Sequence, residues 1–70
     1  MTALDIQVGG SHYKDMKIQP VEFCQLNKLP FLESCVIKRM CRHRGKGGLE
    51  DLQKAIHEIN LLIQLEYGDG

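Results

Sequence analysis

Two prolines and one glycine-rich stretch most constrain how this chain can fold, because they mark where helices begin and end. Pro20 and Pro30 suit the first turn of a helix, since the proline ring fixes φ near the helical value and its missing N–H has no intrahelical partner there. The run at residues 45–48, GKGG, permits the backbone turns that end one helix and start another. These positions predict three helices, over residues 20–27, 30–44 and 49–67.

Apolar residues at three- and four-residue spacing support each predicted helix. In the first helix, Val21 and Cys24 are expected to be buried. The buried stripe predicted for the second helix comprises Leu32, Val36, Ile37, Met40 and Cys41. In the third helix, the a and d positions of a heptad seam are Leu49, Leu52, Ile56, Ile59 and Ile63. Because their connection is short, the second and third helices are expected to form an antiparallel hairpin.

The first 19 residues are expected to form a looped or extended arm. Leu4, Ile6 and Val8 alternate with polar residues, as in a strand, but Gly9 and Gly10 end this pattern after a few positions. The predicted fold is therefore mainly α. It is a single domain over residues 1–70, with the arm at 1–19 and the helices at 20–67.

The chain is also expected to self-associate. A protein of 70 residues buries only about 60% of the surface that its unfolded chain exposes, so its own core is small. Segment 59–65 carries apolar side chains on almost every side of the third helix, which is more than one neighbouring helix covers. A subunit interface explains this surplus, and the sequence predicts a homo-oligomer.

Composition narrows the class of protein. The formal net charge is zero, and no apolar run approaches the roughly 20 residues that span a bilayer. The N-terminus lacks the basic and long apolar regions of a secretory signal. Three cysteines, none in a C-x-x-C pair, fit free thiols in a reducing compartment better than a disulfide framework. We therefore expect a cytoplasmic protein without a membrane partner.

Basic residues are concentrated in one short segment of this neutral chain. The basic residues between positions 38 and 46 are Lys38, Arg39, Arg42, His43, Arg44 and Lys46. On a helix, Lys38 and Arg42 project from the same surface because they are four residues apart. A focused patch of this kind favours a compact anion such as a nucleotide phosphate, and the alternative is a solvated helix face.

A second polar cluster, GGSHYK at residues 9–14, precedes the helices. Its two glycines allow backbone N–H groups to converge on an anion. Ser11, His12 and Lys14 add donors, and Tyr13 can stack on a base. The segment has neither the P-loop pattern nor the dinucleotide fingerprint, so it gains significance only beside the basic segment.

Other chemistries fit the sequence less well. Cys35 and Cys41 are six residues apart and face opposite sides of a helix, which disfavours a zinc site. Cys24 and Cys41 are more simply small buried hydrophobic residues. Successive helical positions also point away from one another, so Cys41 and His43 are not assigned as a nucleophile and its base. The zero net charge and the few aromatic residues disfavour DNA or RNA binding, and no cofactor is expected.

Several motifs occur in an order that resembles a family of small phage-encoded domains of unknown function. They are GGSHYK, IQPVEF and LPFLESCVIKRMCRHRGKGGLEDLQKAIHEINLLI, and they cover most of the chain. A similar domain occurs in the nucleoside monophosphate kinase of podophages, an oligomeric enzyme without a Walker motif. This chain departs from the family pattern at Arg39, Met40 and His43, where the pattern has an aromatic residue, an isoleucine and often another aromatic residue.

The resemblance implies a nucleotide-phosphate site that lies at a subunit boundary. It would be assembled from the early His-Tyr-Lys loop, the basic helix face and the first turn of the third helix. The candidate ligand-binding residues are Ser11, His12, Tyr13, Lys14, Lys38, Arg39, Arg42, Asp51 and Lys54.

The leading hypothesis is a phage protein that binds or sequesters a small nucleotide, linear or cyclic, such as an immune signal of the host. One alternative is a nucleoside monophosphate kinase that uses ATP and Mg²⁺, with Glu50 and Asp51 as metal ligands. The other is an inhibitor that binds a host protein through the apolar rear of the third helix. Because the longer kinase carries sequence that is missing here, binding without catalysis is expected.

Overall fold

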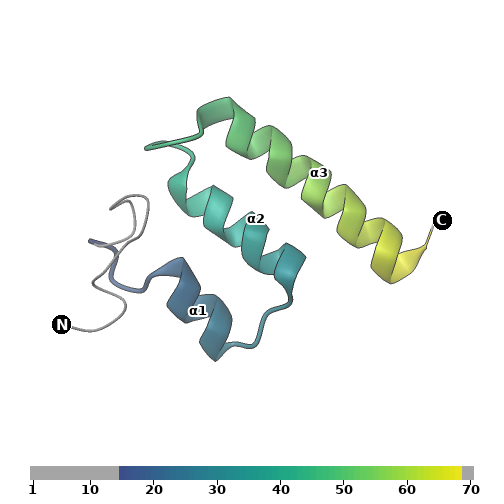
Figure 1. Ribbon diagram of the computed structural model, residues 1–70, viewed down its shortest axis with the longest axis horizontal. Helices are drawn as coiled ribbons and strands as arrows, with labels where there is room; N and C mark the ends of the chain where they lie inside the picture. Colours follow the sequence, from purple (N-terminus) through teal and green to yellow (C-terminus); the bar gives the residue numbers. More distant parts are fainter. Residues whose placement is uncertain (1–14, 69–70) are drawn as a thin grey trace.

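The computed structural model describes residues 15–68, and these residues form three helices and no strand (Figure 1). The helices are α1 (Pro20–Leu26), α2 (Phe31–Arg42) and α3 (Gly48–Tyr67). This confirms the prediction of a mainly helical chain. The arm predicted at residues 1–14 lies outside the described residues.

The prolines and glycines lie at helix ends, within one or two residues of the ends predicted from the sequence. Pro20 is the first residue of α1, whereas Pro30 is the N-cap and α2 begins one residue later. The prediction that the second helix reaches residue 44 is wrong, because the chain turns directly after Arg42. The N–H groups of Gly45 and Lys46 both donate to the Arg42 carbonyl, at 2.9 and 3.0 Å. Gly48 then starts α3 with a positive φ of 55°, a conformation that favours glycine.

The C-terminus of α1 ends in a Schellman motif. The Leu29 N–H donates to the Cys24 carbonyl at 2.9 Å, and the Lys28 N–H donates to the Gln25 carbonyl at 3.1 Å. This motif requires a left-handed residue, and Lys28 supplies it with φ 57°. The turn redirects the chain so that α2 packs back against α1, and the Ser34 hydroxyl donates to the Leu29 carbonyl at 3.2 Å.

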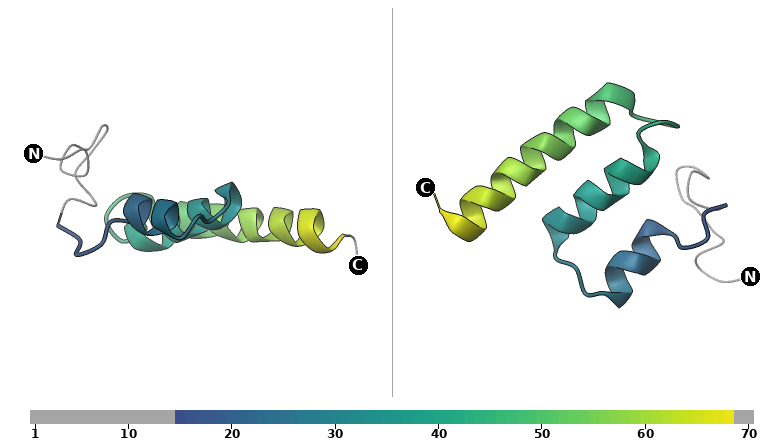
Figure 2. Two further views of the ribbon diagram at one scale, coloured as in Figure 1. Left: turned by 90° about the horizontal axis from the view of Figure 1, so that it is seen from below. Right: turned by 180° about the vertical axis from the view of Figure 1, so that it is seen from behind.

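The three helices lie side by side in one layer. In Figure 1, α2 lies between α1 and α3, and α2 and α3 run in opposite directions. The edge-on view shows the three helices at one level (Figure 2, left). Among residues 15–68, α1 and α3 cover the sides of α2, and no other described segment forms a second layer over its two remaining faces.

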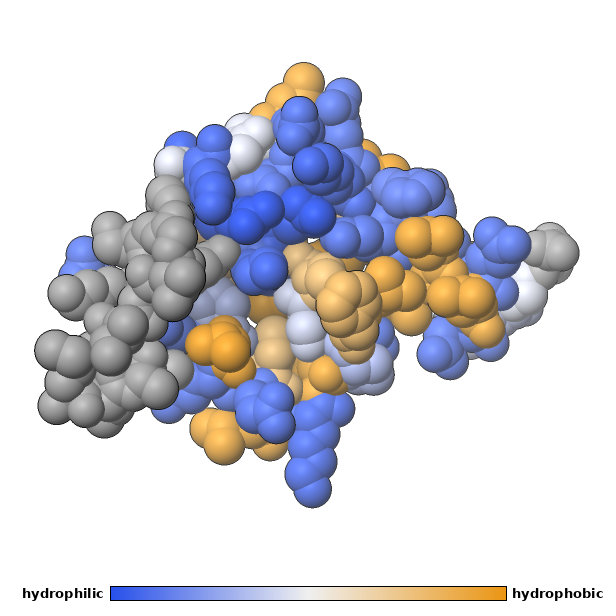
Figure 3. Space-filling model, in the orientation of Figure 1, coloured by the Kyte–Doolittle hydropathy of each residue, from blue (hydrophilic) through white to orange (hydrophobic). Residues whose placement is uncertain are grey.

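Burial is correspondingly sparse within the described residues. The buried apolar side chains are Pro20, Cys24 and Ala55, and no side chain is fully enclosed. The burial predicted for Val21, Met40 and Cys41 is wrong: Val21 is 63% exposed, Met40 is 52% exposed, and Cys41 is also exposed. The apolar stripes of α1 and α2 are wider than the contacts that a single layer provides, so part of each stripe reaches the surface. Apolar side chains also reach the surface over the C-terminal half of α3 (Figure 3).

The described residues contain no membrane span, no metal cluster and no disulfide. None of their helices combines the length and apolar character needed to cross a membrane. Within residues 15–68, no three His, Cys, Asp or Glu side chains gather as a metal site. All three cysteines are free thiols, with Cys24 buried, Cys35 half-buried and Cys41 exposed.

Candidate functional site

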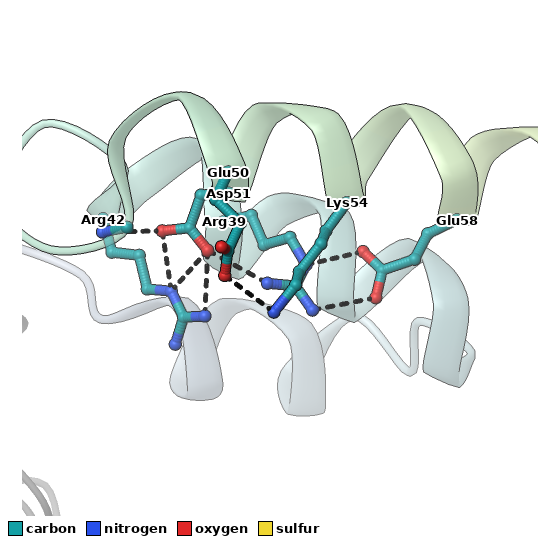
Figure 4. A network of polar contacts seen from close by, with 7 residues as sticks. Arg39, Arg42, Glu50, Asp51, Lys54 and Glu58 are labelled. Carbon is teal, nitrogen blue, oxygen red and sulfur yellow. Dashed lines mark hydrogen bonds and ion pairs between the residues drawn. The ribbon is translucent and has the colours of Figure 1, made fainter.

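Two arginines of α2 and two carboxylates of α3 form the main polar cluster of the described residues (Figure 4). The side chains of Arg39 and Arg42 are 17% and 20% exposed, and those of Asp51 and Glu58 are 4% and 14% exposed. Arg39 spans the cluster. Its Nε donates to Glu58 Oε1 at 2.8 Å, and its Nη1 donates to Asp51 Oδ1 at 2.9 Å. One guanidinium therefore links two turns of α3 to α2.

Asp51 is the centre of this cluster. Arg42 donates from Nη2 to Oδ1 at 3.0 Å and from Nε to Oδ2 at 3.1 Å. The backbone N–H of Gly47 donates to the same Oδ2 at 3.1 Å. A Cβ at Gly47 would overlap the Asp51 carboxylate, so this close approach requires glycine although its φ of −88° suits any residue. Asp51 therefore ties the interhelical turn, α2 and α3 together.

The local charges shift the pKa values of this cluster in the direction of ion pairing. Hydrogen bonds from Arg42, and then from Arg39, hold the pKa of Asp51 below its ordinary value of 3.8, although burial opposes this shift. Hydrogen bonding to Glu58 raises the pKa of Arg39 above its ordinary value, again against burial. Both side chains are therefore charged at neutral pH.

Helical spacing explains why these four residues meet. Arg39 and Arg42 are three residues apart on α2, and Asp51 and Glu58 are seven residues apart on α3, so each pair lies on one helix face. Sequence reasoning named Arg39, Arg42 and Asp51, and the structure brings these three together. It missed Glu58. The spacing of Asp51, Ala55 and Glu58 could have identified Glu58. It places one carboxylate on each side of a small residue, and this small residue allows the helices to approach.

The other candidate residues lie apart from this cluster. Lys54 bonds Glu50 at 3.1 Å, as its i,i+4 spacing indicates, and both side chains are more than half exposed. Lys38 is exposed on α2. The candidates Ser11, His12, Tyr13 and Lys14 lie outside the described residues.

A pocket of about 270 Å³ opens between α1 and α2. Its lining residues are Pro20, Val21, Cys24, Gln25, Leu29, Phe31, Ser34, Cys35 and Lys38. The walls are mostly apolar, and Lys38 supplies the one formal charge among the residues that line it. Phe31 is 78% exposed at its edge. The sequence predicted a phosphate contact for Lys38 but gave no sign of the pocket, because it forms only where α1 and α2 converge after the Lys28 turn.

Comparison with protein families gives one match. The model of DUF3310, described as a protein of unknown function, matches residues 8–60. This range contains the whole of α1 and α2, the Gly47 turn and Asp51 with both of its arginine partners. No curated protein and no solved structure gave a significant match.

Proposed function

This chain belongs to the DUF3310 family, and we propose that it is a self-associating protein that binds a small nucleotide in the pocket between α1 and α2. The observation that carries the proposal is the pairing of apolar pocket walls with a single ammonium group. An apolar cleft with few polar groups is the usual setting for a base or another flat ring, and a lysine is a common partner of phosphate. The volume of about 270 Å³ suits a small ligand of this kind.

Lys38 is the phosphate ligand in this proposal. The guanidinium groups of Arg39 and Arg42 bond Asp51 and Glu58, so we assign them to the joint between α2 and α3. The ammonium group of Lys38 has no such bond to a carboxylate within residues 15–68, and it lies beside the apolar walls. A single charge-assisted contact contributes about 1.5–3 kcal/mol, and the ring in the cleft contributes the remainder.

Three further residues that line the pocket fit the base and sugar of a nucleotide. Phe31 stands at the edge of the pocket, where an exposed ring offers a face for stacking on a base. Gln25 and Ser34 add polar groups for the base or sugar, and the Ser34 hydroxyl already donates to Leu29. The early loop with His12 and Tyr13 is proposed to complete the site, as the family resemblance implies.

Binding without turnover is the form of this proposal that the contacts favour. The carboxylates of the kinase hypothesis are Glu50 and Asp51, and they bond Lys54 and the two arginines. No contact in the described residues favours their use as Mg²⁺ ligands. A protein that binds a nucleotide and leaves it unchanged sequesters it. Such binding would remove a linear or cyclic signalling nucleotide from solution.

A thermal-shift screen against mono-, di-, cyclic and oligonucleotides tests the proposal. A ligand that binds only the folded state at a hundred times its Kd stabilises the protein by about 2.7 kcal/mol, so the Tm should rise. Lys38→Ala should abolish the rise. Lys46→Ala is the matched control, because it removes one exposed positive charge that does not line the pocket.

Two results would count against the proposal. A Tm that no nucleotide changes would reject nucleotide binding, and an equal rise in the wild type and Lys38→Ala would reject this pocket. Incubation of a monophosphate with ATP and Mg²⁺ separates binding from catalysis. We expect no diphosphate product.

A further inference from the structure

Two free thiols line the pocket between α1 and α2. Cys24 comes from α1 and is 7% exposed, and Cys35 comes from α2 and is half-buried. Within residues 15–68, neither sulfur forms a disulfide and neither thiol has a hydrogen-bond partner. The third cysteine, Cys41, is exposed and does not line this pocket. The pocket therefore holds two unpartnered sulfur atoms that the proposed nucleotide contacts do not use.

The turn between α1 and α2 brings the two cysteines to this one space. The Leu29 N–H donates to the Cys24 carbonyl at 2.9 Å, and the Leu29 carbonyl accepts from the Ser34 hydroxyl at 3.2 Å. Leu29 is thus bonded to Cys24 and to the residue that directly precedes Cys35, and it lines the same pocket. The two thiols therefore approach the pocket from two helices that one short turn holds together.

We propose that Cys24 and Cys35 are a thiol pair that a small-molecule disulfide oxidises to a Cys24–Cys35 disulfide. The Cys35 thiolate attacks one sulfur of the oxidant, forms a mixed disulfide and releases one reduced thiol. The Cys24 thiolate then attacks the Cys35 sulfur and displaces the second reduced thiol. The two electrons that the pair loses reduce the S–S bond of the oxidant, and the two released thiolates take up the protons of the protein thiols.

Exposure sets the order of these two steps. Cys35 is half-buried at the pocket, whereas Cys24 is almost enclosed, so an incoming disulfide reaches the Cys35 sulfur first. Cys24 is then the resolving thiol, because it attacks a sulfur that is already in the pocket. The product joins α1 to α2 across the space that we assign to the ligand. Oxidation is therefore expected to close the ligand site, and this consequence rests on the proposed function.

The charge beside the thiols selects the class of oxidant. Lys38 follows Cys35 by three residues on α2 and lines the same pocket. Its ammonium group attracts an anionic disulfide such as oxidised glutathione and repels a cationic disulfide such as cystamine. Lys38→Ala should therefore slow the reaction with oxidised glutathione about tenfold relative to the reaction with cystamine. An unchanged ratio of the two rates would reject an anionic oxidant.

Peptide mapping by mass spectrometry after incubation with oxidised glutathione tests the disulfide. The wild type should contain a Cys24–Cys35 bond. Cys41→Ser is the matched control, because it removes the exposed thiol outside the pocket, and it should form the same bond. In Cys24→Ser the reaction should stop at a mixed disulfide on Cys35, and in Cys35→Ser the Cys24 thiol should stay reduced.

Three results overturn the proposal: Cys24 and Cys35 that stay reduced in the wild type, a bond from either one to Cys41, or a mixed disulfide that persists on wild-type Cys35. If circular dichroism shows that Cys24→Ser is unfolded, the maps of the wild type and Cys35→Ser still decide the matter. The maps need no nucleotide, so their failure leaves the Lys38 thermal-shift test intact. A nucleotide that raises the Tm of the oxidised and the reduced protein equally would reject closure of the ligand site.

Discussion

At the scale of single residues, Asp51 has the most demanding position in the described structure. Its side chain is 4% exposed and accepts hydrogen bonds from two guanidinium groups and one backbone N–H. A buried carboxylate is tolerated only when such partners replace its hydration. Because the partners come from α2 and from the turn at Gly47, this one side chain contributes to holding three segments together.

The lowered pKa of Asp51 predicts how stability depends on pH. Since its pKa in the folded state lies below the ordinary value of 3.8, its stabilising contribution is fully present above that value and is lost as pH falls below it, toward the folded pKa. Asp51→Asn should lower the Tm at neutral pH by about 5–10 °C. Thermal melts from neutral pH to about pH 2.5 should show this difference narrowing below about pH 4.

The control for this measurement is Glu50→Gln. Glu50 is the neighbouring first-turn carboxylate, and its side chain is 73% exposed, so the substitution should change the Tm little at any pH. A constant difference between wild type and Asp51→Asn over the whole pH range would contradict the assignment of the acid-sensitive ion pair to Asp51.

At the scale of elements, the turn between α1 and α2 places a lysine, Lys28, in a backbone conformation that favours glycine. Lys28 adopts the left-handed conformation of the Schellman turn. This conformation costs an L-residue about 1–2 kcal/mol, whereas glycine adopts it without that cost. Glycine loses more backbone entropy on folding, which offsets part of that gain. Lys28→Gly should therefore stabilise the protein by about 0.5–1 kcal/mol and raise the Tm by roughly 2–8 °C.

Lys28→Ala is the control for this prediction. It removes the same charge and side chain but keeps the Cβ, so the conformational cost remains and the Tm should not rise. Calorimetry of the two variants beside the wild type separates the effects. An equal increase in both would attribute the gain to loss of the lysine side chain rather than to the backbone.

The helices were predictable from sequence because their signals are local. Pro20 and the glycines around Gly47 act through their own backbone preferences, and the apolar periodicity of α3 from Leu49 to Ile63 repeats over about four turns. The end of α2 was misplaced by two residues because the Arg42 carbonyl forms turn hydrogen bonds that no residue pattern announces. Likewise, the basic residues were recognised, but their partners were not. Whether Arg39 meets a ligand phosphate or Glu58 depends on the packing of two helices.

The pocket and the exposed apolar residues of α3 show the same limit at longer range. A pattern identifies Ile56 as part of an apolar face, but it does not specify which surface covers that face. Lys38 was recognised as a cation, whereas its apolar neighbours Val21 and Leu29 belong to segments whose approach depends on the turn at Lys28. His12 and Tyr13 lie outside residues 15–68, so their roles stay predictions from the sequence.

At the scale of the whole molecule, the single layer of helices is the feature that most affects behaviour in solution. Pro20, Cys24 and Ala55 are the only buried apolar residues in the described part of the chain, so residues 15–68 form a small core by themselves. Much of the stabilising apolar contact is then expected to come from association. Folding and assembly should be coupled by mass action.

This coupling predicts a Tm that depends on protein concentration. Over roughly a hundredfold range of concentration, the Tm of the wild type should rise by several degrees, because the associated form binds only folded protomers. A wild-type Tm that stays constant over this range, by scanning calorimetry, would contradict coupled assembly.

The sharing of Asp51 between two arginines has a consequence for any anion that approaches α2. To bind Arg39, the anion must draw its guanidinium away from a carboxylate that is almost shielded from water. The abandoned carboxylate would lose a partner at the joint between α2 and α3, and that loss weakens the net affinity of this location for the anion. Because any net binding to the folded protein raises the Tm, it is the response of the thermal shift to Lys38→Ala, and not its direction, that distinguishes the two locations.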